Sequence, residues 1–161
     1  MNQRWISFSG LMICIASMVF AIAYLEKTLN LDPCPLCMLD RAVITAIAVV
    51  FLLAWLHNPT GWGKRIYGLL TTLLIFTGIG ISGRHIWIQN LPADQVPSCG
   101  ADFDYMWDNW PLGEMIQTIL KGSGDCADVV WQFLGLTIPE QVLLFMIGLL
   151  VLTYFAFRKT S

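Results

Sequence analysis

Four of the five cysteines form two pairs whose positions suit thiol exchange. Cys34 and Cys37 belong to the sequence Cys-Pro-Leu-Cys, while Cys99 and Cys126 lie in one long polar stretch. A thiolate attacks a disulfide through a mixed disulfide, so two such pairs on one side of a membrane can pass electrons to each other. The pattern predicts a redox protein in which all four sulfurs are catalytic.

The residues around Cys37 predict an electron-acceptor site. If Cys34 caps a helix, Pro35 takes the first helical position and Cys37 the third, where free backbone N–H groups and the helix dipole favour an anion. Arg41 follows one turn later on the same face. A guanidinium there would favour the thiolate and could bind an oxygen of a small acceptor. We therefore expect a dithiol that faces an acceptor.

Charged residues at membrane depth also have a plainer interpretation. Asp40, Arg41 and Arg84 are costly in such a position. Arg41 could instead extend to the membrane surface and pair with Asp40. His85 could contact a cofactor, or could be a histidine at the membrane interface bonded to a neighbour. The sequence leaves both alternatives open.

Cys99 and Cys126 could form either a structural or an exchangeable disulfide. They are 27 positions apart, and the turn formers between them make a disulfide that closes this loop geometrically reasonable. Because small and polar residues flank both sulfurs, we expect little obstruction to an incoming thiolate, as in labile exposed disulfides. Cys14, in an apolar run, is expected to be a small buried hydrophobic residue.

A metal centre is the main alternative use of a CxxC motif, which is half of many zinc and iron–sulfur sites. Cys99 and Cys126 do not form a second CxxC motif, and His57 and His85 are the only histidines. The sequence therefore indicates no close cluster of cysteine and histidine, and no metal site is predicted.

The composition is that of an integral membrane protein. Hydrophobic residues make up 57% of the 161 residues and charged residues 12%, well below the roughly 25% charged residues of soluble domains. Apolar runs long enough to span a membrane predict four transmembrane helices, at about 5–25, 38–56, 66–88 and 138–157. We expect an all-α membrane protein, a four-helix transmembrane bundle, in a single domain covering 1–161.

The first apolar run has a second interpretation as a cleaved signal peptide. Arg4 precedes it, and Ala21-Ile22-Ala23 loosely fits a cleavage site. However, the run is longer than the usual apolar region of a signal peptide and continues past that site. We expect a retained transmembrane helix.

The basic residues predict the orientation, since Lys and Arg in short loops remain cytoplasmic. Arg4, Lys64–Arg65 and Arg158–Lys159 mark one side, and the loops at about 26–37 and 89–137 lie on the other. Both termini should be cytoplasmic, and both cysteine pairs should face the periplasm of a bacterial inner membrane, where disulfides persist. A net charge of −2 without a basic cluster argues against nucleic acid as a partner.

One part of the long outer loop has a helical pattern. Apolar residues recur at helical spacing behind Pro111, namely Leu112, Met115, Ile116, Ile119 and Leu120. This stripe predicts a short helix, which could lie in the membrane interface or pack on the end of the bundle. In either case it would tether a cysteine loop whose movement we expect to assist exchange.

These motifs together resemble the DsbB family of bacterial disulfide bond formation proteins. The resemblance covers nearly the whole chain and is carried by Pro33-Cys34-Pro35-Leu36-Cys37 before Asp40-Arg41, the Cys99 loop, and Gly124-Asp125-Cys126-Ala127 followed by Trp131-Gln132-Phe133-Leu134-Gly135-Leu136. Pro35 and Asp40 are small departures, where an aliphatic residue and a glutamate are familiar. The first could shift the reduction potential of the pair.

The resemblance implies an electron relay. A periplasmic DsbA-like oxidase of the thioredoxin fold would attack the Cys99–Cys126 disulfide, with Cys99 forming the mixed disulfide. The Cys34–Cys37 pair would reoxidise the loop pair, and Cys37 would pass the electrons to membrane quinone. Arg41 would hold a quinone oxygen, with His85 as a weaker candidate for the same pocket. The choice between ubiquinone and menaquinone stays open, as do the preferred partner, the range of client proteins, the reduction potentials and the oligomeric state.

Two alternatives remain beside this relay. A quinone-linked oxidase of the vitamin K epoxide reductase type is expected to have its loop cysteines before the CxxC motif, the reverse of the order here. A noncatalytic membrane adaptor would need only the disulfide of its outer loop, and has no use for a free CxxC motif beside Arg41.

Overall fold

Four long helices dominate the computed structural model, which describes residues 3–92, 94–96 and 103–157. Helix α1 (Gln3–Val19) continues as a π-helix, η1 (Phe20–Thr28), and is followed by α2 (Pro35–His57), α3 (Trp62–Gln89) and, after the outer segment, α6 (Ile138–Phe157). Each of the four is long and apolar enough to cross a membrane. The expected helical bundle is confirmed.

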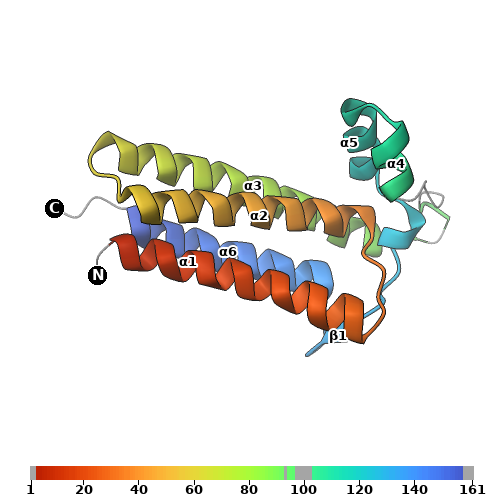
Figure 1. Cartoon of the computed structure of the whole chain (residues 1–161). Coiled ribbons are helices and arrows are strands. Elements are labelled where there is room, and N and C mark those ends of the chain that lie inside the picture. Colours follow the sequence, from red (N-terminus) through yellow and green to blue (C-terminus); the bar gives the residue numbers. More distant parts are fainter. Residues whose placement is uncertain (1–2, 93, 97–102, 158–161) are drawn as a thin grey trace.

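The four helices form a closed ring. Each of α1, α2 and α3 packs against its successor in this set, and α6 closes the ring by packing against both α3 and α1. Figure 1 shows the start of α1, the end of α6 and the turn between α2 and α3 at one end of the bundle, with the start of α2 at the other. A helix satisfies its own backbone hydrogen bonds in lipid, which is why these apolar runs are helical.

Glycines allow the helices to approach closely. A Cβ atom on Gly10 of α1 would lie 2.9 Å from the ring of Phe51 in α2, and one on Gly78 of α3 would lie 2.6 Å from the methyl carbon of Met146 in α6. Cys14, Phe51 and Met146 are fully buried in the same apolar core. Cys14 is therefore the buried hydrophobic residue that the sequence predicts. Small residues at helix contacts are the usual solution in membranes, where van der Waals packing drives association.

The outer segment between α3 and α6 forms short elements at one end of the bundle. They are α4 (Phe103–Asn109), α5 (Leu112–Lys121), the 3-10 turn η2 (Gly124–Cys126) and a hairpin of β1 (Gln132–Phe133) and β2 (Leu136–Thr137). The hairpin was not expected from the sequence. Leu134 and Gly135 both have positive φ values, 53° and 80°, as tight two-residue hairpin turns require.

Helix α5 forms where the apolar stripe predicts it and packs on the bundle. Met115 and Ile119 are buried against Leu36 at the start of α2 and Ile88 near the end of α3. Arg84 of α3 secures the C-terminal end of α5 by donating hydrogen bonds to the carbonyl oxygens of its last two residues, each 3.1 Å long. The remaining apolar residues of the stripe are exposed: Leu112, Ile116 and Leu120.

The contact at Gly78 yields a test of the packing. Gly78→Leu should destabilise the bundle by about 1–3 kcal/mol, because the added side chain enters a filled core at Met146. Gly80→Leu is the matched control, since a Cβ atom on Gly80 would meet nothing within 4 Å. Thermal unfolding of both variants in detergent measures the difference. Equal transition temperatures would show that α3 and α6 do not meet closely at Gly78.

Candidate active site

The CxxC motif begins α2 as the sequence predicts, but the N-terminus of the helix stabilises the sulfur of Cys34 and not that of Cys37. Cys34 is the N-cap, Pro35 takes the first helical position, and the backbone N–H of Cys37 donates a 3.4 Å hydrogen bond to Sγ of Cys34. We expected the free N–H groups to favour the sulfur of Cys37. A side chain at the N-cap accepts from the third helical residue, so the helix terminus supports Cys34 instead.

The two sulfurs are close to bonding distance. Sγ of Cys34 and Sγ of Cys37 are 2.9 Å apart, and both cysteines are free. A disulfide bond is roughly 2.05 Å long, so the two thiols are in contact and a small movement of either side chain brings the sulfurs to bonding distance.

His85 of α3 completes this group. Its Nε2 lies 3.8 Å from Sγ of Cys34, and the ligating atoms of Cys34, Cys37 and His85 all lie within 4.8 Å of one another. The expectation that the chain contains no close cluster of cysteine and histidine is therefore wrong. The sequence could not reveal the cluster because 51 positions separate Cys34 from His85 and only the contact between α2 and α3 joins them.

His85 also has an unused nitrogen. The residue is only 3% exposed, and its Nδ1 is buried without a hydrogen-bond partner among the described residues. An unpaired polar atom in an apolar site costs free energy unless a ligand or water satisfies it. Of the two interpretations of His85, this geometry favours contact with a ligand.

Cys126 lies beside Cys34 and is buried. It has no exposed surface and packs in an apolar cluster with Leu36, Met106 and Ile119. A hydrogen bond to the Cys34 side chain, together with burial, raises the pKa of Cys126 well above its ordinary value. The expected accessibility of Cys126 to an incoming thiolate is therefore wrong, because α4, α5 and Leu36 cover this sulfur.

Cys99 lies outside the described residues. Its predicted disulfide with Cys126 lies outside them too, and Cys126 has a free thiol in the structure. Of the four predicted catalytic cysteines, the structure brings together Cys34, Cys37 and Cys126, from the start of α2 and from η2.

Arg41 pairs with a residue that the sequence did not single out. Its Nη1 donates a 2.7 Å hydrogen bond to Oε2 of Glu26 in η1. Pairing with Asp40, which we considered from the sequence, is wrong: neighbouring residues on a helix point in different directions. Glu26 is 15 positions before Arg41 and meets it only because η1 packs beside α2. The spacing of the two residues in the sequence therefore did not predict the pair.

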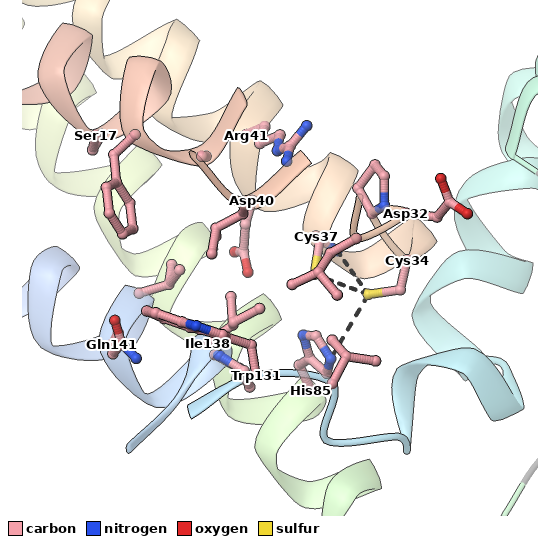
Figure 2. Close-up of a pocket in the computed structure, with 18 of the residues that line it drawn as sticks. Ser17, Asp32, Cys34, Cys37, Asp40, Arg41, His85, Trp131, Ile138 and Gln141 are labelled. Atoms are coloured by element: carbon pink, nitrogen blue, oxygen red, sulfur yellow. Dashed lines mark hydrogen bonds between the residues drawn. The ribbon is translucent and has the colours of Figure 1, made fainter. Parts of the chain in front are cut away.

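Asp40 instead points into the protein. It is 3% exposed, and the hydroxyl of Ser82 in α3 lies 3.3 Å from each of its carboxylate oxygens. Figure 2 shows its carboxylate facing the cavity that also contains Cys37 and His85. The sequence singled out Asp40 because a charge at membrane depth is costly. It did not indicate that the side chain points into the protein.

A cavity of about 560 Å³ joins these groups, a size typical of small-molecule sites. Its walls come from α1, η1, α2, α3, α6 and the segment before β1, and most of the lining is apolar, for example Leu25, Ile44, Val142 and Phe145. Trp131 lines the cavity and lies 6.2 Å from Phe20 and 6.4 Å from Tyr24, measured between ring centroids. The hairpin segment is thereby anchored to η1 by aromatic contacts.

The residues present fit a flat, apolar electron acceptor with carbonyl oxygens. The apolar walls suit a ring, while Arg41 and the unpaired Nδ1 of His85 offer hydrogen-bond donors to an oxygen. Cys37 lines the same cavity. The arrangement can therefore oxidise a dithiol against an acceptor bound within the protein.

The buried contact between Cys34 and Cys126 yields a chemical test. In the fully reduced protein, Cys34→Ala should speed alkylation of Cys126 several-fold at neutral pH. Removing the Cys34 sulfur lowers the raised pKa of Cys126 and increases its thiolate fraction. Mass spectrometry after timed iodoacetamide labelling measures the rate, with Cys14→Ala as the control. An unchanged Cys126 rate in Cys34→Ala would show that the two sulfurs are not in contact.

Comparisons with known proteins identify the family of this chain. The family model "Disulfide bond formation protein DsbB" matches residues 3–156. The chain is 46% identical over its full length to Disulfide bond formation protein B of Nitrosococcus oceani, covering 95% of that protein, and 47% identical over 99% of its length to that of Marinobacter nauticus, covering 94%. The chain therefore belongs to the DsbB family of membrane oxidoreductases that form disulfide bonds.

Proposed function

We propose that this protein reoxidises a periplasmic DsbA-like oxidase of the thioredoxin fold and passes the electrons to membrane quinone, as a protein dithiol:quinone oxidoreductase. One observation carries the proposal. The sulfur of Cys34 touches Cys37, His85 and Cys126 on the wall of an apolar cavity. A sulfur in that position can exchange with the outer segment and with an acceptor-facing thiol.

The outer half of the relay is thiol exchange. The reduced partner attacks Cys99 of the Cys99–Cys126 disulfide, forms a mixed disulfide and releases Cys126. A second attack, by the partner's other thiol, frees Cys99 and releases the oxidised partner. The loop dithiol then exchanges with the Cys34–Cys37 disulfide, and the short approach of Cys126 to Cys34 supports this route. The burial of Cys126 supports the assignment of the external attack to Cys99.

The inner half regenerates the Cys34–Cys37 disulfide. Quinone supplies an acceptor for two electrons and two protons that dissolves in the bilayer, where this cavity lies. Glu26 binds one N–H group of the Arg41 guanidinium, and the remaining N–H groups are directed to an acceptor oxygen. His85 offers a second contact through Nδ1. Cys37 lines the cavity and delivers the electrons.

The proposed setting is a bacterial inner membrane. Lys64 and Arg65 begin α3 at the end of the bundle opposite the cysteines. By the excess of basic residues on the cytoplasmic side, that end faces the cytoplasm and the cysteines face the periplasm. Membrane lipid surrounds the bundle, whose large exposed residues are apolar along the helices, including Leu69, Phe76 and Val151. The whole chain acts as one integral membrane domain.

The arginine defines the first test. Arg41→Ala should raise the KM for a short-chain quinone roughly 10- to 150-fold, because charge-assisted hydrogen bonds are worth about 1.5–3 kcal/mol. Purified protein in detergent is supplied with a reduced DsbA-like oxidase, and quinone loss is followed by absorbance. Lys27→Ala, which removes an exposed cation of η1, should keep the wild-type KM. A wild-type KM in Arg41→Ala would remove Arg41 from the acceptor site.

A trapping experiment tests the exchange route. Cys37→Ala should accumulate a disulfide between Cys34 and Cys126, because the Cys34 thiolate attacks the adjacent Cys126 sulfur of the loop disulfide and releases Cys99, while Cys37 is no longer there to displace Cys126 from Cys34. Peptide mapping without reduction identifies the bond. Cys14→Ala is the control and should show none of it. Cys34 found linked only to Cys99 would contradict the proposed route.

A further inference from the structure

One buried titratable group in the cavity has no role in the relay described so far. Asp40 lies on α2 one turn after Cys37, is 3% exposed, and lines the cavity together with both cysteines and His85. A carboxyl group at membrane depth is costly and therefore points to a function. The nearby cation, Arg41, pairs with Glu26, so a salt bridge to Arg41 does not explain why Asp40 is there.

The surroundings of Asp40 fix the carboxyl group but leave some of its hydrogen-bond acceptor positions free. Among the described residues, Ser82 is the single hydrogen-bond partner of the Asp40 carboxyl group, at 3.3 Å from both oxygens, which is long for a hydroxyl donor. A carboxylate has about four acceptor positions. Lone pairs of Asp40 therefore remain for a ligand in the cavity.

Asp40 and His85 form a pair across the cavity. The two interact electrostatically, and His85 contacts the sulfur of Cys34 through Nε2. Its Nδ1 is buried without a partner among the described residues. Figure 2 shows the imidazole ring beside the dithiol, with the carboxylate of Asp40 on the α2 wall of the same cavity.

The chemistry of the reaction requires groups that move protons. Oxidation of the Cys34–Cys37 dithiol breaks two S–H bonds, forms one S–S bond and releases two electrons and two protons. Reduction of a quinone to a quinol consumes both electrons and both protons in two O–H bonds. Because Asp40 and His85 are each only 3% exposed, bulk water is a poor route for protons at these two groups.

We propose that Asp40 is a proton-transfer residue of this cavity, taking a proton from the dithiol and giving it to an acceptor oxygen. His85 takes the proton of the Cys34 thiol at Nε2 and releases one from Nδ1 to one acceptor oxygen. Asp40 takes the proton of the Cys37 thiol, one turn away on α2, at a carboxylate oxygen and gives it to the other acceptor oxygen. Both groups end unchanged, and the two protons and two electrons of the dithiol reach the acceptor. Ser82 holds the carboxyl group in place. This inference rests on the proposed function.

Other charged groups near the cavity define the control. Asp32, Asp125 and Asp128 line it from the outer loops and are exposed, while α6 contributes only uncharged residues to the lining. Arg41 and its partner Glu26 flank the α1 side. Asp32→Asn, which removes an exposed carboxylate from the cavity, is therefore the control for the infrared readout. Glu114→Gln, which removes an exposed carboxylate of α5 outside the cavity lining, is the control for the kinetics.

The kinetic test compares Asp40→Asn, Asp40→Glu and Glu114→Gln in single-turnover reduction of a short-chain quinone by prereduced protein. Asp40→Asn should slow turnover about a hundredfold or more while leaving the quinone Kd, measured by quenching of tryptophan fluorescence, close to that of wild type. Asp40→Glu should recover most of the rate, and Glu114→Gln should match wild type. A wild-type rate in Asp40→Asn overturns the proposal, whereas absence of quinone reduction by wild type overturns the proposed function itself.

A second readout needs no quinone. Reduction of the Cys34–Cys37 disulfide by a phosphine should change the infrared carboxyl band of Asp40 in wild type and in Asp32→Asn, and this change should be missing in Asp40→Asn. Asp40→Glu should shift the band, which keeps the assignment testable if Asp40→Asn does not fold. A wild-type spectrum without a carboxyl change on reduction would overturn the proposal.

Discussion

The sulfur of Cys34 is the point on which the rest of the structure depends. It accepts a hydrogen bond from the backbone N–H of Cys37 because α2 begins at this point. It contacts Nε2 of His85 because α3 packs beside α2. Cys126 reaches it from η2. Three segments that are distant in the sequence therefore meet at one atom. Backbone N–H groups are free only at a helix N-terminus, so a sulfur at the N-cap is held by the backbone and remains available for exchange.

The costly charges of the bundle each have a defined partner, and these partners shape the site. Arg41 is fixed by Glu26 of the π-helix η1, and Arg84 holds the carbonyl oxygens at the end of α5. Asp40 is held by Ser82. π-Helical segments are rare and often occur at functional sites, which agrees with the position of η1 beside the cavity. The contacts of Arg41 and Asp40 thus join membrane-spanning helices to one another, and the contact of Arg84 joins α3 to α5.

The burial of Cys126 explains how exchange can be kept internal. A thiol in an apolar cluster with Leu36 and Ile119 is shielded from soluble thiols, and a thiol with a raised pKa is a weak nucleophile near neutral pH. Its reactivity is then limited to the neighbour that it touches, Cys34. In the proposed relay, the attack of the soluble partner is therefore assigned to Cys99.

Local patterns in the sequence determined the four helices, helix α5 and the start of α2 at Cys34, because apolar length and N-cap chemistry act between near neighbours. The motifs also identified the family. The tertiary structure alone decided which side chains meet. The contact of His85 with Cys34, the pairing of Arg41 with Glu26 and the inward turn of Asp40 depend on how neighbouring helices are rotated about their axes. That rotation is set by packing of the whole ring, for example at Gly10 and Gly78, and spacing along one helix carries no information about it.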